Sequence, residues 1–134
     1  MSTIAMITSH PHPTAGLDPE LLAEAIDAAA ACATICTACA DACLAEESVA
    51  DLRDCIRTDL DCADICAATA SVLSRRTGTV SSTLKSLLTA CRAACATCAE
   101  DCAEHADMHE HCRICAEACR RCEKACAELL SAIG

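Results

Sequence analysis

Apolar and small residues recur along four segments of the chain at alternating intervals of three and four positions. This interval is typical of one face of an α-helix, which makes a turn about every 3.6 residues. The pattern predicts helices over residues 18–46, 48–76, 79–105 and 107–133, each about 38 Å long. Because only a few residues join each helix to the next, neighbouring helices are expected to run antiparallel. We therefore expect an all-α fold, an antiparallel up-down-up-down four-helix bundle.

Capping residues support these helix boundaries. Asp18 and Pro19 suit the N-cap and the first helical position of the first helix. Ser48 and Asp107 are expected to cap the second and fourth helices, each with an acidic residue three positions later. Residues 18–134 are therefore expected to form a single four-helix bundle domain.

The segment 1–17 lacks the helical pattern and contains the run Ser9-His10-Pro11-His12-Pro13. We expect it to be a flexible, extended N-terminal tail, and a Cu or Ni site at His10 and His12 is a less favoured alternative. Met1 to Gly16 also has no Lys or Arg and no apolar stretch typical of a secretory signal. The sequence therefore predicts a cytoplasmic protein.

Cysteine occupies most of the repeating positions. The chain contains 16 cysteines, and within each segment they follow one another mainly at intervals of three or four. These intervals mark the seam that faces the interior of a helical bundle, so the thiols are expected to line the core. The second helix misses one interval, and Asp59 occupies that position. The cysteines are Cys32, Cys36, Cys39, Cys43, Cys55, Cys62, Cys66, Cys91, Cys95, Cys98, Cys102, Cys112, Cys115, Cys119, Cys122 and Cys126.

Composition excludes several classes of protein. The chain has no Phe, Trp or Tyr, and only three Gly and three Pro, which is too few breakers for an all-β fold. No run of about 18 uncharged apolar residues occurs, so a membrane span is not expected. The formal net charge of −10 and the lack of a basic stripe disfavour nucleic-acid binding.

The cysteine spacing also disfavours a disulfide scaffold. Side chains four residues apart on one helix run parallel, with Cβ atoms about 5–6 Å apart. A disulfide needs converging Cβ atoms about 3.8 Å apart. The sequence therefore predicts reduced thiols in a reducing compartment.

A core of thiols indicates soft-metal binding. Val, Leu or Ile would fill the space better without the risk of oxidation, so the sulfur itself is wanted. Thiolates select Cu(I), Zn(II) and iron–sulfur clusters. One Cu(I) per thiolate leaves the core neutral, and Cu(I) accepts two or three ligands. The sequence therefore predicts storage of multiple Cu(I) ions, on the order of one per thiol.

Other metals fit the sequence less well. Zinc in Cys₄ layers would leave half of the thiolate charge uncompensated in a buried core. Such a zinc or general soft-metal thiolate buffer is the alternative that we keep. Iron–sulfur clusters need convergent loop cysteines such as a C-x₂-C-x₂-C-x₃-C run, which the chain lacks.

One end of the predicted bundle carries polar side chains, and we call this end the mouth. There the first and third helices end and the second and fourth begin. Leucine and isoleucine close the opposite end, at Leu22, Leu73, Leu84, Leu88, Leu129 and Ile133. Imidazole, thioether and carboxylate groups at the mouth are expected to capture an ion and pass it inward to thiolates. These groups are Asp59, His105, Met108, His109 and His111.

The spacing C-x₃-C-x₂-C-x₃-C occurs at Cys32–Cys43 and Cys91–Cys102, and a denser run spans Cys112–Cys126. On these runs the chain resembles the bacterial copper storage proteins, specifically their cytosolic branch, over about residues 18–133. The resemblance implies a four-helix bundle whose inward thiolates hold many Cu(I) ions, assembled into a homotetramer. It also implies a metal entrance at the histidine-bearing end, which corresponds here to Cys55, Asp59, His105 and His109.

Catalysis is not expected. A di-iron oxidase bundle needs inward Glu-x-x-His motifs, and in this chain no Glu precedes a His by three positions. A thiol redox catalyst needs one exposed cysteine pair of low pKa, whereas sixteen equivalent positions single out none. The expected partners are copper ions, further copies of the chain and a copper chaperone that the sequence does not identify.

Overall fold

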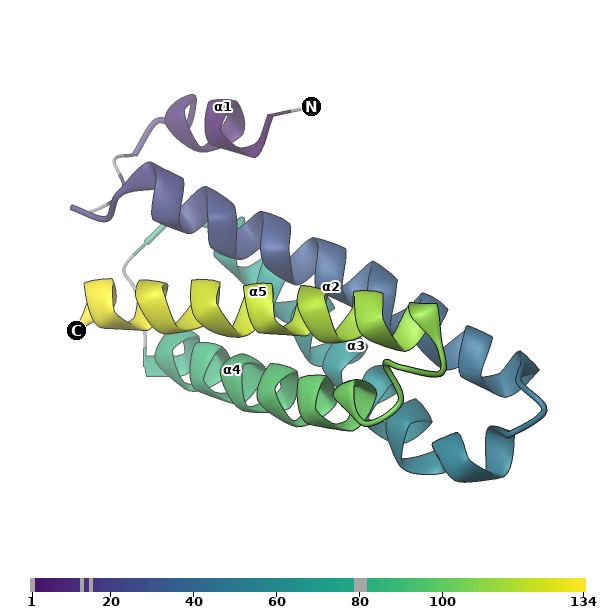
Figure 1. Cartoon of the computed structure of the whole chain (residues 1–134). Helices are drawn as coiled ribbons and strands as arrows, with labels where there is room; N and C mark the ends of the chain where they lie inside the picture. Colours follow the sequence, from purple (N-terminus) through teal and green to yellow (C-terminus); the bar gives the residue numbers. More distant parts are fainter. Residues whose placement is uncertain (1, 13, 15, 79–81) are drawn as a thin grey trace.

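Helices make up all the regular structure in residues 2–12, 14, 16–78 and 82–134, the part of the chain that the computed structural model describes. The all-α expectation is confirmed for these residues (Figure 1). The elements are α1 (Thr3–Thr8), α2 (Pro19–Ala45), the 3₁₀ helix η1 (Val49–Leu52), α3 (Arg53–Leu73), α4 (Ser82–Ala103) and α5 (Glu110–Ile133).

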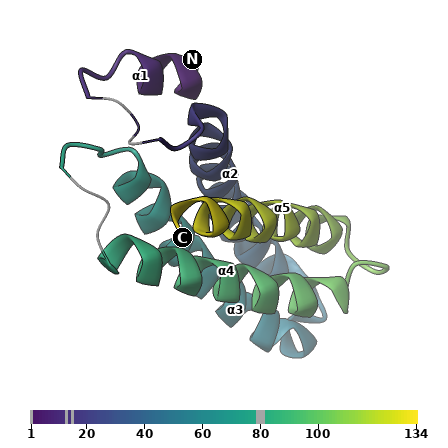
Figure 2. The ribbon, with the colours of Figure 1, turned by 90° about the vertical axis from the view of Figure 1, so that its left-hand side faces the viewer.

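The four long helices pack side by side around a common interior. α2 contacts α3 and α5, and α4 contacts the same two helices, so each long helix has two neighbours. Figure 2 shows α4 and α5 side by side along their length. The seams of all four helices therefore meet in one core.

The helix ends agree with the sequence at α2 and differ at α3 and α5. The Asp18 carboxylate accepts a hydrogen bond from the Glu20 backbone N–H at 2.9 Å, as expected of an N-cap. Ser48 makes no side-chain cap, because a 3₁₀ turn separates it from α3. Asp107 is not the cap of α5 either. Past the end of α4 the chain keeps turning, with the Met108 and His109 N–H groups both donating to the His105 carbonyl, so His109 is the N-cap.

The prediction of an extended tail over residues 1–17 is wrong for residues 3–8, which form α1. Ser2 caps this short helix by accepting from the Ala5 N–H at 3.2 Å, and Ile7 is buried against the bundle. Arg76 donates from Nη2 to the Ile7 carbonyl at 2.8 Å. Burial of Ile7 outweighs the loss of chain entropy that made a mobile tail the simpler expectation. Figure 1 shows α1 lying against α2.

The histidines after α1 interact with each other. The His12 backbone N–H donates to His10 Nδ1 at 3.0 Å, and their ring centroids are 5.5 Å apart. One ligating nitrogen of His10 is thus already engaged by the backbone. Pro13 lies outside the described residues.

By length and hydropathy alone α2 could cross a membrane, since a window of this helix has a mean hydropathy of 1.6. That value comes mainly from alanine and cysteine. All four of its cysteines face the bundle interior and are buried. The apolar content of α2 is therefore consistent with a core helix.

The apolar residues expected to close the end of the core opposite the mouth are buried or partly buried. Leu22, Leu73, Leu88 and Leu129 are buried, and Leu84 and Ile133 are partly buried against them. Between this apolar cap and the thiols lies Thr69, which is fully buried and donates from Oγ1 to the Ile65 carbonyl at 2.8 Å.

Leu129→Ala should lower the free energy of unfolding by about 2–5 kcal/mol, because it leaves a cavity in the closed end of the bundle. Leu44 is the matched control, since it is 62% exposed while Leu129 is fully buried. Leu44→Ala should cost less than about 1 kcal/mol. Urea unfolding of the reduced protein, followed by far-UV circular dichroism, measures both. Equal losses in the two variants would contradict this account of the core.

Candidate metal centre

The sixteen cysteines form a column along the axis of the bundle. All of them are free thiols, and each is at most 2% exposed. Successive cysteines on one helix lie one turn apart, except that Asp59 replaces a cysteine between Cys55 and Cys62 on α3, and the seams of α2, α3, α4 and α5 meet at the same axis. The expectation that the cysteines line the core is therefore confirmed by their burial.

The column consists of overlapping groups of potential ligands. In each group the ligand atoms lie within 4.8 Å of one another. Consecutive groups share a thiol, so a series of five runs without interruption to the mouth. From the inner end, the groups are Cys32, Cys66, Cys95 and Cys122; then Cys32, Cys36, Cys62 and Cys119; then Cys36, Cys98, Cys115 and Cys119; then Cys39, Asp59, Cys102 and Cys115; and finally Cys39, Cys43, His111 and Cys112.

The sulfur atoms are spaced for metal ions that share ligands. Sγ–Sγ distances include 3.6 Å for Cys36 and Cys119, 3.6 Å for Cys66 and Cys95, and 3.4 Å for Cys55 and Cys102. A disulfide requires about 2.05 Å. Sulfurs bound to one ion at about 2.3 Å lie about 3.8 Å apart in a tetrahedron. The column therefore approaches ligand spacing before any ion is bound.

Burial raises the pKa of thiols in this column, while hydrogen bonds from neighbouring thiols raise the pKa of some and lower that of others, namely Cys32, Cys39, Cys62, Cys91 and Cys98. Burial raises the pKa of the Cys43 thiol to about 11. Hydrogen bonding from its neighbours, Cys115 first, raises the pKa of Cys36. Neutral thiols allow the metal-free core to fold, since the free-energy cost of burying sixteen thiolate anions would be too high. Each cation that binds must then displace protons.

Asp59 lies inside the column and is fully buried. The thiols of Cys98, Cys115 and Cys102 donate to its Oδ1 at 3.0, 3.2 and 3.4 Å, and Cys55 Sγ lies 4.0 Å from Oδ2. Its inward position is as the sequence predicts. In the described residues thiols surround it, because α4 and α5 present sulfur at this level.

The environment of Asp59 favours the protonated acid. Burial, reinforced by Cys115 and by the hydrogen bond from Cys98, raises the pKa of this carboxyl group to about 12. In the metal-free protein Asp59 is therefore a neutral group that becomes anionic only when a cation arrives.

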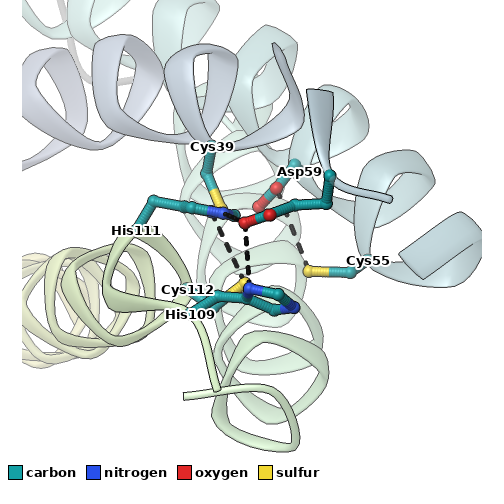
Figure 3. Close-up of polar contacts among 7 residues, drawn as sticks. Cys39, Cys55, Asp59, His109, His111 and Cys112 are labelled. Carbon is teal, nitrogen blue, oxygen red and sulfur yellow. Dashed lines mark hydrogen bonds and ion pairs between the residues drawn. The ribbon is translucent and has the colours of Figure 1, made fainter. Parts of the chain in front are cut away.

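At the mouth, Glu46 joins two histidines, and Figure 3 shows these histidines, His109 and His111, beside Cys39 and Cys112. His109 Nδ1 and His111 Nε2 each lie 2.9 Å from Glu46 Oε2, and the two rings stack with centroids 5.4 Å apart. The hydrogen bond from His111 lowers the pKa of Glu46. Glu46 therefore remains a carboxylate that orients both rings.

His111 also faces the thiols. Its Nδ1 lies 3.4 Å from Cys39 Sγ and 3.6 Å from Cys112 Sγ. Burial alone would lower the pKa of His111, but its contacts with Cys39 and Glu46 raise it overall. In its neutral form, with Nε2 donating to Glu46, the ring presents the lone pair of Nδ1 to the sulfurs. Cys39, Cys43, His111 and Cys112 therefore form a mixed ligand set, which we call the mouth cluster.

The structure does not bring every predicted residue into contact with this cluster. Met108 is 77% exposed, and its backbone serves only to close the α4–α5 turn. His105 is half-buried, and in the described part of the chain its hydrogen bonds are made by its backbone. Both lie beside the mouth without touching its ligands through a hydrogen bond or ion pair.

Sequence reasoning missed Glu46, which we treated only as the end of the first helix. A signal was present, since Glu46 lies three residues after Cys43 and so continues the inward seam. Thr69 was missed for the same reason, three residues after Cys66.

Asp59→Asn should stabilise the metal-free protein at pH 8, and the gain should shrink as the pH falls to 5. The pKa of Asp59 is higher in the folded than in the unfolded state, so the parent protein has its full stability below about pH 4 and loses part of it as the pH rises. Asparagine does not ionise, so the variant escapes this loss. The limiting slope is about 1.4 kcal/mol per pH unit. Urea unfolding of reduced protein across this range measures it. Asp64→Asn, at an exposed position of the same helix, is the control; a parallel pH profile in the two variants would contradict the buried neutral acid.

Comparisons with known proteins agree with this geometry. The chain matches the family model "Csp: Copper storage protein" over residues 18–131. The copper storage protein Ccsp from Streptomyces lividans, in a structure loaded with 10 copper equivalents, is 54% identical with a TM-score of 0.94, covering 97% of this chain and 98% of that one.

A structure of copper loading to a cytosolic copper storage protein from Streptomyces lividans, with five coppers, is 60% identical, with a TM-score of 0.82 over 84% of this chain and 93% of that one. Cu(I)-bound copper storage protein BsCsp3 is 35% identical, with a TM-score of 0.68 over 78% and 92%. A search of the curated proteins gave no match. The family match and these structural likenesses show that the chain belongs to the copper storage protein family.

Proposed function

We propose that this protein stores copper in the cytoplasm by binding many Cu(I) ions to the thiolates that line its core. One observation carries the proposal: five ligand groups that share thiols run in series to the mouth. Shared thiolates are what a multinuclear Cu(I) assembly needs, because each sulfur can bridge two ions. A discrete structural metal site would need only one such group.

Charge favours a monovalent ion in this core. Each Cu(I) displaces about one proton from a thiol, so the column is close to neutral both when empty and when full. Cu(I) is also satisfied by two or three thiolates, which neighbouring turns and helices supply with Sγ–Sγ distances of 3.4–3.7 Å. The relatives described as copper-loaded or Cu(I)-bound support the same ion.

We infer that α2, α3, α4 and α5 run up-down-up-down. Cys43 and Cys102 lie near the ends of α2 and α4, and Cys55 and Cys112 near the starts of α3 and α5. The contact of Cys55 with Cys102, and the grouping of Cys43 with Cys112, support a common end for all four. This order leaves one polar mouth and one apolar end.

Copper enters at the mouth in this proposal. The mouth cluster and Asp59 act as successive ligands, with imidazole and carboxylate groups capturing the ion before softer thiolates take it. His105, Met108 and His109 lie beside this path and supply further donors at its rim. The remaining cysteines, from Cys36 inward to Cys126, form the store.

Several further properties follow from the sequence and the family. We infer a binding role rather than catalysis, a cytoplasmic location, and one bundle domain over residues 18–134. A homotetramer and delivery by a copper chaperone extend the proposal. The exposed apolar side chains of Leu60 and Ile114 provide area on the bundle surface for contacts between copies.

A zinc or general soft-metal buffer is the second candidate. Cys32, Cys66, Cys95 and Cys122 favour it, because one thiol from each long helix forms a Cys₄ set. Its weakness is charge, since a divalent ion on four fully buried thiolates leaves two negative charges without compensation.

Anaerobic titration of the reduced protein with Cu(I), in competition with a Cu(I) chelator, should saturate at on the order of one ion per thiol. The chain has no aromatic residue, so Cu(I)–thiolate charge-transfer bands should rise from a nearly blank ultraviolet background. Zn(II) adds little absorbance there. Saturation at one or two copper ions would refute the storage proposal.

His105→Ala and Asp59→Ala should each slow Cu(I) loading by about tenfold or more while leaving the final capacity nearly unchanged, because they remove groups along the entrance and not in the store. Stopped-flow absorbance of the charge-transfer bands measures the rate. His12→Ala, beyond α1 in the N-terminal segment, is the control. Loading at the parent rate in both mouth variants would remove the entrance role.

A further inference from the structure

The mouth cluster differs in chemistry from the groups behind it. It combines the thiols of Cys39, Cys43 and Cys112 with the imidazole of His111. Three thiolates and one imidazole are a donor set typical of tetrahedral zinc in proteins. Cu(I) has no need of four donors, so this set provides more ligands than the cargo ion requires.

The two distances from the His111 nitrogen match a tetrahedron, and all four ligand atoms lie within 4.8 Å of one another. A zinc ion with Zn–S of about 2.3 Å and Zn–N of about 2.0–2.1 Å places sulfur and nitrogen about 3.5 Å apart. His111 Nδ1 lies 3.4 Å from Cys39 Sγ and 3.6 Å from Cys112 Sγ. The imidazole therefore already has the position that a tetrahedral ion would require.

Glu46 supplies the supporting contact that histidine ligands of zinc usually have. Its carboxylate accepts from His111 Nε2 at 2.9 Å, which fixes the tautomer and leaves Nδ1 free for metal. The same oxygen lies 2.9 Å from His109 Nδ1. These contacts with Glu46 hold the ring in place before metal arrives.

Charge and access separate this cluster from the interior. A divalent ion on three thiolates and a neutral imidazole leaves one negative charge, at a site whose thiols are buried but whose His111 side chain is 25% exposed. The same ion on Cys32, Cys66, Cys95 and Cys122 would leave two negative charges among side chains with no exposure. The penalty for buried uncompensated charge therefore confines divalent ions to the mouth.

We propose that the mouth cluster is a tetrahedral site for one divalent ion of the zinc class, distinct from the Cu(I) store. The bound ion occupies the entrance, so incoming Cu(I) must displace it by ligand exchange, without any change in oxidation state. The delay in copper loading rests on the proposed storage function, whereas the divalent site itself does not.

Co(II) is the probe, because zinc has no visible absorption. Titration of the reduced, metal-free protein under anaerobic conditions should give the visible bands of tetrahedral thiolate-bound Co(II), saturating at one ion per chain. Zn(II) should then bleach these bands. Protein loaded first with Zn(II) should take up Cu(I) several-fold more slowly than metal-free protein, to the same final capacity.

Variants locate the site. Glu46→Ala should weaken Co(II) binding by about 10–100-fold, because it removes the support of His111. Glu47→Ala, at the exposed neighbouring acid, should leave it unchanged. His111→Ala should abolish the tetrahedral bands, with far-UV circular dichroism reporting whether the variant folds. If that variant unfolds, the Glu46 and Glu47 pair decides the question.

The outcomes separate this inference from the storage function. No tetrahedral Co(II) signal, or several Co(II) ions per chain that are indifferent to Glu46→Ala, would overturn the mouth site. Either result could accompany a full Cu(I) capacity. A single Co(II) site in a protein that saturates with one or two Cu(I) ions would support the site and refute storage.

Discussion

The neutrality of the buried thiols is the constraint on which the rest of this structure depends. Sixteen sulfur atoms lie in a core with almost no exposure, and such a core is stable only while protons or cations balance them. Raised pKa values, as at Cys43 and Asp59, keep the empty protein in that condition. A cargo of unit positive charge preserves it, and this links the fold directly to the choice of metal.

Helix geometry arranges the buried thiols as a continuous series of ligands along the bundle. Intervals of three and four place thiols on the inner face at successive turns, interrupted on α3 by Asp59, and four helices bring such faces to one axis. Neighbouring groups then share ligands instead of forming separate sites; Cys36 and Cys39, for example, each belong to two groups. Sharing lowers the number of ligands needed for each ion, so a small domain with modest packing still offers a large number of binding positions.

The sequence was sufficient for the helices, the inward seam and the apolar closing residues, because these follow from periodicity alone. It was insufficient where local geometry decides. The N-cap of α5 is His109 and not Asp107, because the turn after α4 continues past Asp107. α1 forms because Ile7 is buried against the bundle. Glu46 orients His109 and His111 only because the fold brings them into contact with it, although they lie more than sixty residues away along the chain.

The leucines at the far end close the thiol column, so that it opens only at the mouth. Leu88 and Leu129 are fully buried and offer no donor atom, so an ion that has reached the innermost sulfurs has the mouth as its polar way back. Ions near the mouth shield those behind them. The protein would then hold two pools of metal, one exchanging quickly with the cell and one retained deep inside, released in the reverse of the order in which it was filled.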